Sequence, residues 1–283
     1  MLNKAVRFLK RLRAMGRINI SLSRGALGSY TRSIDLTDPR SWEFSAFSQN
    51  GEDGIIDVLL SQSKSLNRYF IEIGSSDGIE NNTSYLGIVK KYRGIMVEGN
   101  KKASKECDLN VAYLCSKDFI SCVPMFVNQE NIETLKNMSL YKDPDVLSLD
   151  IDSIDYYVAK AIVEIGFRPK IFVVEYNSAF GPDQNLTIEY KNDFAVLPEH
   201  KELYYGVSLS GWKKMFQMYG YHFVTVDTNG VNAFFVNSHE FDQNFLHNIE
   251  GLNFAENGLQ SLRLRMDWRG QFNLIKHLKF VEI

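Results

Sequence analysis

The chain has 283 residues, of which 45% are hydrophobic and 23% charged, and its formal net charge is -2. A chain of this length can bury enough surface to fold without disulfides or a structural metal, as one large domain or two modest ones. The near-neutral balance argues against a nucleic-acid binder that is basic throughout.

The charge is unevenly distributed along the chain. Eight basic residues and no acidic residue precede Asp35, so residues 1–34 carry +8 and the remainder −10. Over residues 1–20, apolar and basic side chains fall on opposite sides of a helix, which predicts a basic amphipathic helix. Two interpretations remain open: peripheral contact with an anionic membrane, or the alternative of a helix packed on its own domain or a disordered arm.

Cysteine usage and hydropathy bear on the compartment. Cys107, Cys115 and Cys122 form no CxxC pair, which fits a reducing compartment. No run reaches the roughly 18 apolar residues of a membrane-spanning helix, and the first residues lack the apolar core of a signal peptide. We therefore expect a cytoplasmic protein, with the inner face of the membrane as the place of any peripheral contact.

Residues 21–47 are rich in turn formers and predict a connector. A helix should follow, capped by Ser48 or Asn50. From Arg68 onward, strands and helices alternate. We expect strands near 69–73, 94–98, 120–126, 145–150 and 170–175, with helices near 81–91, 101–107 and 155–165. Residues 208–219 predict a further helix, and 221–227 with 231–236 predict a hairpin.

This alternation is typical of a mainly parallel sheet with helices on both faces, whose ligands bind beyond the carboxyl ends of the strands. The first strand is followed by a loop from Gly74 to Gly78, where glycines permit a tight turn and close backbone approach. The second strand ends at Glu98, which is placed to accept hydrogen bonds from ribose hydroxyls. Because Asp77 would repel a pyrophosphate, S-adenosylmethionine suits this loop better than a dinucleotide.

Acidic and amide side chains follow two later strands. Asp150 and Asp152 share one side of the chain after the fourth strand, and Glu175 and Asn177 do so after the fifth. If these strands are neighbours, the four side chains could hold Mg²⁺, or could bind a donor ammonium and a sugar hydroxyl directly. For Asp152 alone, capping of the next helix is the alternative. Carboxylates at the ends of buried strands need a ligand, metal or cationic partner.

With these residues assembled, the chain resembles the FkbM-type branch of the class I S-adenosylmethionine-dependent methyltransferases. The matching segments are 48–54, 70–78, 81–83, 94–98, 147–152, 172–177 and 232–236. The resemblance implies an α/β Rossmann-like fold, with a mainly parallel seven-stranded sheet, a C-terminal antiparallel hairpin and helices on both faces. It covers the expected methyltransferase domain, 44–240. It does not cover the basic arm and connector, 1–43, or residues 241–283, where we expect a C-terminal helical extension packed on the same domain.

The resemblance implies an S-adenosylmethionine-dependent O-methyltransferase that acts on a sugar or glycan-type hydroxyl. The expected cofactor-binding residues are Gly74, Ser75, Asp77, Gly78, Asn82 and Glu98. We expect Asp150 to act as the catalytic base or as a metal ligand, supported by Asp152 and Glu175, with Asn177 completing a Mg²⁺ site. Residues 177–207 should supply the acceptor pocket. Tyr190, Tyr204 and Tyr205 either stack on sugar faces there or fill the core.

A second hypothesis remains open. The loop departs from the commoner Asp-x-Gly-Ala-Asn form of the family, because Glu72 replaces the aspartate and Ser75-Ser76-Asp77 replaces Ala-Asn-x. This departure favours the alternative of a non-catalytic methyltransferase-like module for membrane-associated interaction. Neither hypothesis includes a nucleic-acid partner.

Overall fold

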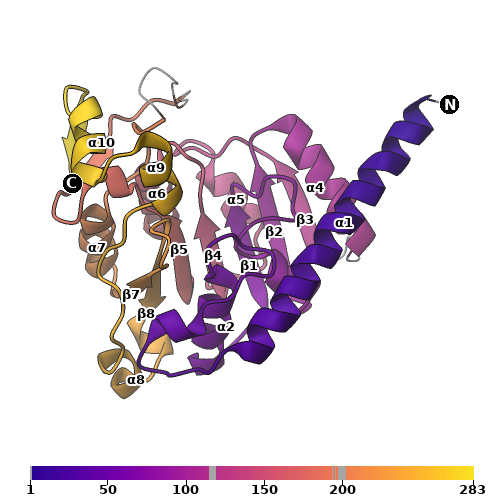
Figure 1. Ribbon diagram of the computed structural model, residues 1–283, viewed down its shortest axis with the longest axis horizontal. Coiled ribbons are helices and arrows are strands. Elements are labelled where there is room, and N and C mark those ends of the chain that lie inside the picture. Colours follow the sequence, from indigo (N-terminus) through magenta and orange to yellow (C-terminus); the bar gives the residue numbers. More distant parts are fainter. Residues whose placement is uncertain (1, 115–118, 193, 195, 197–201) are drawn as a thin grey trace.

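A seven-stranded sheet forms the centre of the computed structural model, which describes residues 2–114, 119–192, 194, 196 and 202–283 (Figure 1). Its strands are β1 (Tyr69–Ile73), β2 (Arg93–Glu98), β3 (Ile120–Pro124), β4 (Val146–Leu149), β5 (Ile171–Glu175), β7 (Tyr221–Val226) and β8 (Asn232–Asn237). The order is β3-β2-β1-β4-β5-β8-β7. Strands β1 to β5 pair in parallel, and β8 runs antiparallel to both β5 and β7. The predicted fold class is confirmed, including the closing hairpin.

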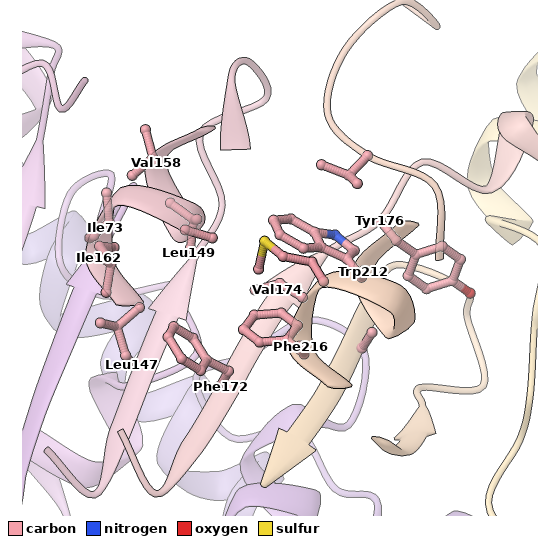
Figure 2. Packing of buried hydrophobic residues seen from close by; sticks show 14 of the residues in the cluster. Ile73, Leu147, Leu149, Val158, Ile162, Phe172, Val174, Tyr176, Trp212 and Phe216 are labelled. Carbon is pink, nitrogen blue, oxygen red and sulfur yellow. The ribbon is translucent and has the colours of Figure 1, made fainter. Parts of the chain in front are cut away.

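Helices cover both faces of this sheet. They are α2 (Glu52–Gln62), α3 (Ser84–Ile88), α4 (Lys101–Leu114), α5 (Ile132–Met138), α6 (Asp155–Glu164), α7 (Leu209–Met218) and α8 (Gln243–His247). Because side chains alternate along a strand, each strand contributes to two cores. One core includes buried residues of α5, α6 and α7, and the other includes residues of α2, α3, α4 and α8. Figure 2 shows the first core, where Phe216 of α7 lies over Phe172 of β5 with ring centroids 4.7 Å apart.

The N-terminal helix α1 (Leu2–Thr31) is longer than predicted and continues into the first part of the expected connector, as far as Thr31. Ile18, Ser21 and Gly25, spaced on one helical face, are buried against the domain. A Cβ at Gly25 would lie 2.5 Å from the Cβ of Ala46, so the two backbones approach closely. This packing extends the helix beyond its amphipathic first 20 residues. Figure 1 shows the N-terminal end of α1 projecting past the sheet.

The C-terminal extension, 241–283, contains α8, α9 (Gly258–Leu264) and α10 (Trp268–Ile275), and ends in a strand, β9 (Phe280–Glu282). The expected helical extension therefore also includes one short strand. β9 pairs antiparallel with β6 (Leu186–Ile188), which lies in the segment expected to supply the acceptor pocket. Phe280 also packs against Phe180 of η2 (Ser178–Phe180) and against Tyr204, with both pairs of ring centroids 5.2 Å apart. The end of the chain thus holds the segment that follows β5.

None of the helices in the described ranges combines the length and apolar character needed to cross a membrane.

Candidate active site

A cavity of about 840 Å³ lies at the carboxyl ends of β1, β2 and β4, where the strand order reverses. Six of the predicted site residues line it: Gly74, Asp77, Asn82, Glu98, Asp150 and Asp152. The other four predicted residues, Ser75, Gly78, Glu175 and Asn177, lie outside its lining.

The loop after β1 is shaped by backbone contacts that require glycine. Gly74 has a φ of +93°, and a Cβ there would lie 1.7 Å from the carbonyl oxygen of Asp150. The backbone N–H groups of Gly74 and Ser75 both donate to the carbonyl of Val97. Ser75 is fully buried, so this predicted cofactor residue supports the loop from beneath. At Gly78 a Cβ would lie 2.7 Å from the sulfur of Cys107, so this glycine allows the loop to pack on α4.

Glu98 is held at the cavity wall by its own neighbours. Its carboxylate accepts hydrogen bonds from the backbone N–H of Ser76, at 2.8 Å, and of Asn100, at 2.7 Å. A carboxylate can accept about four hydrogen bonds, so capacity for the two hydroxyls of a ribose remains. Met125 and Phe126 line the same cavity. Together they provide an apolar surface of the kind that a flat base requires.

Glu72, in the middle of β1, is a cavity residue that sequence reasoning missed. Its side chain is 1% exposed, and one carboxylate oxygen accepts from the hydroxyl of Ser148 at 3.0 Å. Asn82 donates in turn to that hydroxyl at 3.2 Å. The second oxygen of Glu72 has no hydrogen-bond partner among the described residues. Burial raises the pKa of Glu72 to about 8. The sequence did carry one signal for a role of Glu72 at the site: it is a charged residue inside the apolar run 69–73.

Two segments of the resemblance that were not expected at the ligand site, 48–54 and 232–236, meet at this cavity. The side-chain amide of Asn232 donates to Glu52 at 2.7 Å, and both residues line the cavity. The amide oxygen of Asn232 has no partner in the described part of the chain.

The N-cap residue of α2 is Gly51, which has no side chain to cap the helix. Neither expected cap, Ser48 or Asn50, occupies the N-cap position. The hydroxyl of Ser48 accepts from the backbone N–H of Asp53 in the first turn, and the side-chain amide of Asn50 donates to Glu52.

Three carboxylates gather beyond β4 and β5, which are neighbours as the prediction required. One oxygen each from Asp150, Asp152 and Glu175 lies within 4.8 Å of the others. Burial raises the pKa of Asp150 and Glu175 well above the usual range, and neighbouring acidic charges raise both further. Burial also raises the pKa of Asp152. A group of acids in this situation binds a proton or a cation.

Asp152 does not cap the following helix. Its φ of 50° is a left-handed conformation that a residue other than glycine seldom adopts. Asp155 instead accepts from the backbone N–H groups of Ile151, at 3.1 Å, and Ser153, at 2.8 Å. Ile154 is the N-cap of α6 and has no side-chain cap. The carboxylate of Asp152 is therefore available to the three-carboxylate group.

The side chain of Asn177 is committed elsewhere. It is 1% exposed, donates to the carbonyls of Leu203 and Tyr205, and accepts from the N–H of Ala179. These bonds hold the segment after β5, while the hydroxyl of Tyr205 donates to Glu175 at 3.2 Å. Of the three tyrosines considered for sugar stacking, Tyr205 alone reaches an acid of the cluster. Residues 193, 195 and 197–201 of this segment lie outside the described residues, as does Cys115.

The basic helix α1 also reaches the cavity. Arg13 and Arg17 line it, although α1 lies outside the resemblance. The guanidinium of Arg17 forms an ion pair with Asp77 and lies 3.8 Å from the carboxylate of Glu80. The N-terminal helix is thus part of the cavity wall.

Comparisons with known proteins find only distant likenesses, all to solved structures. No family model matches the chain, and no curated protein matches it. An O-methyltransferase from Bacillus cereus in complex with SAH is 13% identical, covers 78% of this chain and 89% of its own, and has a TM-score of 0.43. The O-methyltransferase TomG from Streptomyces achromogenes, in complex with SAM, is 13% identical, covers 77% and 95%, and also has a TM-score of 0.43. Likenesses at this level do not establish a family or an activity for this chain.

Proposed function

We propose that this protein is an S-adenosylmethionine-dependent O-methyltransferase that acts on a hydroxyl of a sugar or glycan-type acceptor. One observation carries the proposal. A single cavity at the switch point of the sheet joins Glu98, the loop at Gly74 and the carboxylates of Glu72 and Asp150. The first two features suit a nucleoside, and the last two suit a cationic group next to a reacting hydroxyl.

S-adenosylmethionine can supply hydrogen-bond donors to buried oxygen atoms of the cavity that have no partner among the described residues. Its ribose would lie at Glu98, and its methionine portion would lie near Gly74. The free carboxylate oxygen of Glu72 and the free amide oxygen of Asn232 are buried acceptors, which are costly without a partner. The ammonium of the donor can donate to both. Bound there, the positive donor would also keep Glu72 ionised, against the effect of burial on its pKa.

In methyl transfer the protein mainly positions the two reactants and accepts a proton. The acceptor oxygen attacks the methyl carbon in line, the carbon–sulfur bond breaks with its electron pair left on sulfur, and the hydroxyl proton leaves to a base. Asp150 lines the cavity, so we assign it as that base. Asp152 and Glu175 hold it within a cluster whose negative charge favours proton uptake.

A divalent ion is a second role for the same carboxylates. Asp150, Asp152 and Glu175 offer three oxygens within 4.8 Å, and Mg²⁺ is commonly held by a few carboxylates and waters. The residues fit such an ion, which would polarise the acceptor hydroxyl. We omit Asn177 from the ligand set, because its amide nitrogen donates to Leu203 and Tyr205 and its oxygen accepts from Ala179. Full activity after exhaustive EDTA treatment would remove the metal from this proposal.

The acceptor would be bound by the segment after β5. Tyr205 brings this segment to Glu175, and β9 holds its other side through β6. For placement, we propose a cytoplasmic protein whose α1 contacts the inner face of the membrane. Phe8, Leu9 and Leu12 of α1 are 62%, 63% and 48% exposed, which supports that contact.

The test combines calorimetry with a transfer assay. The intact protein should bind S-adenosylhomocysteine saturably and pass a labelled methyl group from S-adenosylmethionine to surface glycans. Asp150→Asn should keep donor binding and lower transfer by about 10²-fold or more. Absence of donor binding by the intact protein would overturn the proposal. Donor binding without transfer to any glycan extract would favour the non-catalytic membrane-associated module.

A further inference from the structure

A second hollow, of about 890 Å³, lies between α1 and α4. We call it the α1–α4 groove. It shares Arg13, Arg17, Asp77 and Glu106 with the cavity of the candidate active site. Six of its 13 lining residues are basic: Lys10, Arg11, Arg13, Arg17, Lys102 and Lys105. Three are acidic: Asp77, Glu106 and Asp108. A concave surface with this excess of positive charge attracts anions.

The basic residues of the groove outnumber the acids that could neutralise them. Glu106 pairs with Lys10 at 2.6 Å, and Asp77 pairs with Arg17. The remaining basic residues lie on both walls: Arg11 and Arg13 on α1, and Lys102 and Lys105 on α4. None of these four forms an ion pair with another residue of the described ranges. The groove therefore keeps an excess of positive charge, contributed by both helices, for an external anion.

An exposed apolar stripe runs along α1, between Arg11 and Arg13 around the helix. Phe8, Leu12 and Met15 are spaced i, i+4 and i+7 on α1, with Leu9 next to them, and all four are exposed. On the opposite wall, Leu109 of α4 lines the groove and is 57% exposed. An acidic peptide or a nucleic acid would use the charges and leave the apolar side chains in water. An anionic membrane surface uses both.

We propose that the α1–α4 groove binds the phosphate of an anionic lipid headgroup while the apolar stripe enters the boundary between headgroups and acyl chains. This inference rests on the membrane contact proposed above and names its site and ligand. It extends the contact from α1 to Lys102 and Lys105 of α4. It does not depend on methyl transfer.

The experiment measures partition of the full chain onto vesicles of phosphatidylcholine alone, and of phosphatidylcholine with phosphatidylserine. The variants remove one charge each from α4. Lys105→Gln acts inside the groove, and Lys101→Gln is the matched control, because Lys101 is exposed on the same helix and does not line the groove. Lys105→Gln should lower partition onto anionic vesicles about fivefold, the equivalent of about 1 kcal/mol for one basic residue. Lys101→Gln should lower it less than twofold.

A soluble probe separates the headgroup from a free anion. Calorimetry with inorganic pyrophosphate tests the groove without a membrane, and Leu12→Ser tests the apolar stripe. Leu12→Ser should weaken vesicle binding and leave the response to pyrophosphate unchanged. Tight pyrophosphate binding that Lys105→Gln removes, with no binding to anionic vesicles, would overturn the lipid as ligand. Capture of single-stranded DNA in place of vesicles would overturn it as well.

The outcomes also separate this inference from the proposals on which it stands. Equal losses for Lys105→Gln and Lys101→Gln would show diffuse attraction, which overturns the groove and leaves the membrane contact. No binding to anionic vesicles by the unmodified protein would overturn both. Binding of S-adenosylhomocysteine should be unchanged in Lys105→Gln, because Lys105 does not line the donor cavity. Failure of the methyltransferase proposal would appear only in that donor measurement.

Discussion

The guanidinium of Arg17 in α1 pairs with the carboxylate of Asp77 in the loop after β1. The two residues come from opposite sides of the predicted domain boundary, one from the basic arm and one from the glycine loop. Their side chains are 36% and 17% exposed, so water screens the pair only in part. The pair joins the N-terminal helix to the wall of the cavity.

This pair should contribute measurably to stability. A double-mutant cycle with Arg17→Gln and Asp77→Asn should give a coupling of about 1 kcal/mol in the free energy of unfolding. The same cycle on Lys10 and Glu106, whose side chains are 56% and 35% exposed, is the control and should give less. Denaturant unfolding measures both. A coupling near zero for Arg17 and Asp77 would mean that this ion pair does not help to hold α1 on the domain.

Gly74→Ala should destabilise the protein and abolish donor binding. The added Cβ would meet the carbonyl oxygen of Asp150 at 1.7 Å, so the loop and the end of β4 must separate. Gly166→Ala is the control, because Gly166 also has a positive φ, +97°, but nothing lies within 4 Å of the new Cβ. We expect the control to cost about 1–2 kcal/mol from backbone strain. The cost at Gly74 should exceed it clearly, and equal costs in thermal or denaturant unfolding would contradict the close packing.

The buried carboxyl group of Glu72 should make stability depend on pH. Burial raises its pKa in the folded protein from 4.5 to about 8, so the folded state holds a proton that the unfolded state releases at lower pH. Its effect on stability is therefore fully present below about pH 4.5 and is lost as pH rises toward about 8. Over that range the unmodified protein should lose roughly 2–5 kcal/mol of its free energy of unfolding, and Glu72→Gln should not. Denaturant unfolding of both proteins between pH 5 and 8 measures this difference. Free energies of unfolding that change with pH in parallel for the two proteins would contradict this account.

Glu98→Gln should weaken binding of S-adenosylhomocysteine by about tenfold or more. The substitution keeps the shape of the side chain but removes charge-assisted hydrogen bonds to the ribose. Glu106→Gln is the control, because Glu106 also lines the cavity but pairs with Lys10 at its surface. Calorimetry should show little change for that control. Equal affinities for Glu98→Gln and the unmodified protein would place the ribose elsewhere.

The sheet was predictable because each strand is a short apolar run closed by a turn, and parallel strands carry their last residues to one rim. Glu98 and Asp150 could be assigned for that reason, from their position at strand ends. β6 and β9 have three residues each, too few for a periodic pattern, so their pairing came only from the structure. The extent of α1 likewise depends on close packing at Gly25, which the spacing of residues 1–20 does not encode.

The candidate site shows the same division between local and distant information. The alternation of side chains brings Asp150, Asp152 and Glu175 together, but it treats Asn177 as their equivalent. The amide of Asn177 instead donates to the carbonyls of Leu203 and Tyr205, 26 and 28 residues away. Arg17 could not be assigned from the sequence for a related reason, since its partner Asp77 lies 60 residues further along the chain. Such contacts depend on tertiary packing, for which the sequence carries no local signal.

Arg13 and Arg17 stand in the wall that separates the donor cavity from the α1–α4 groove. Under the two proposals, an anionic headgroup on one side and a cationic donor on the other act on the same two guanidinium groups. A headgroup that engages Arg17 reduces the neutralisation of Asp77 and so makes the cavity more attractive to the donor. Thermodynamic linkage then requires that a bound donor strengthen attachment to the membrane by the same factor. The protein would hold its donor most tightly at the surface to which it is attached.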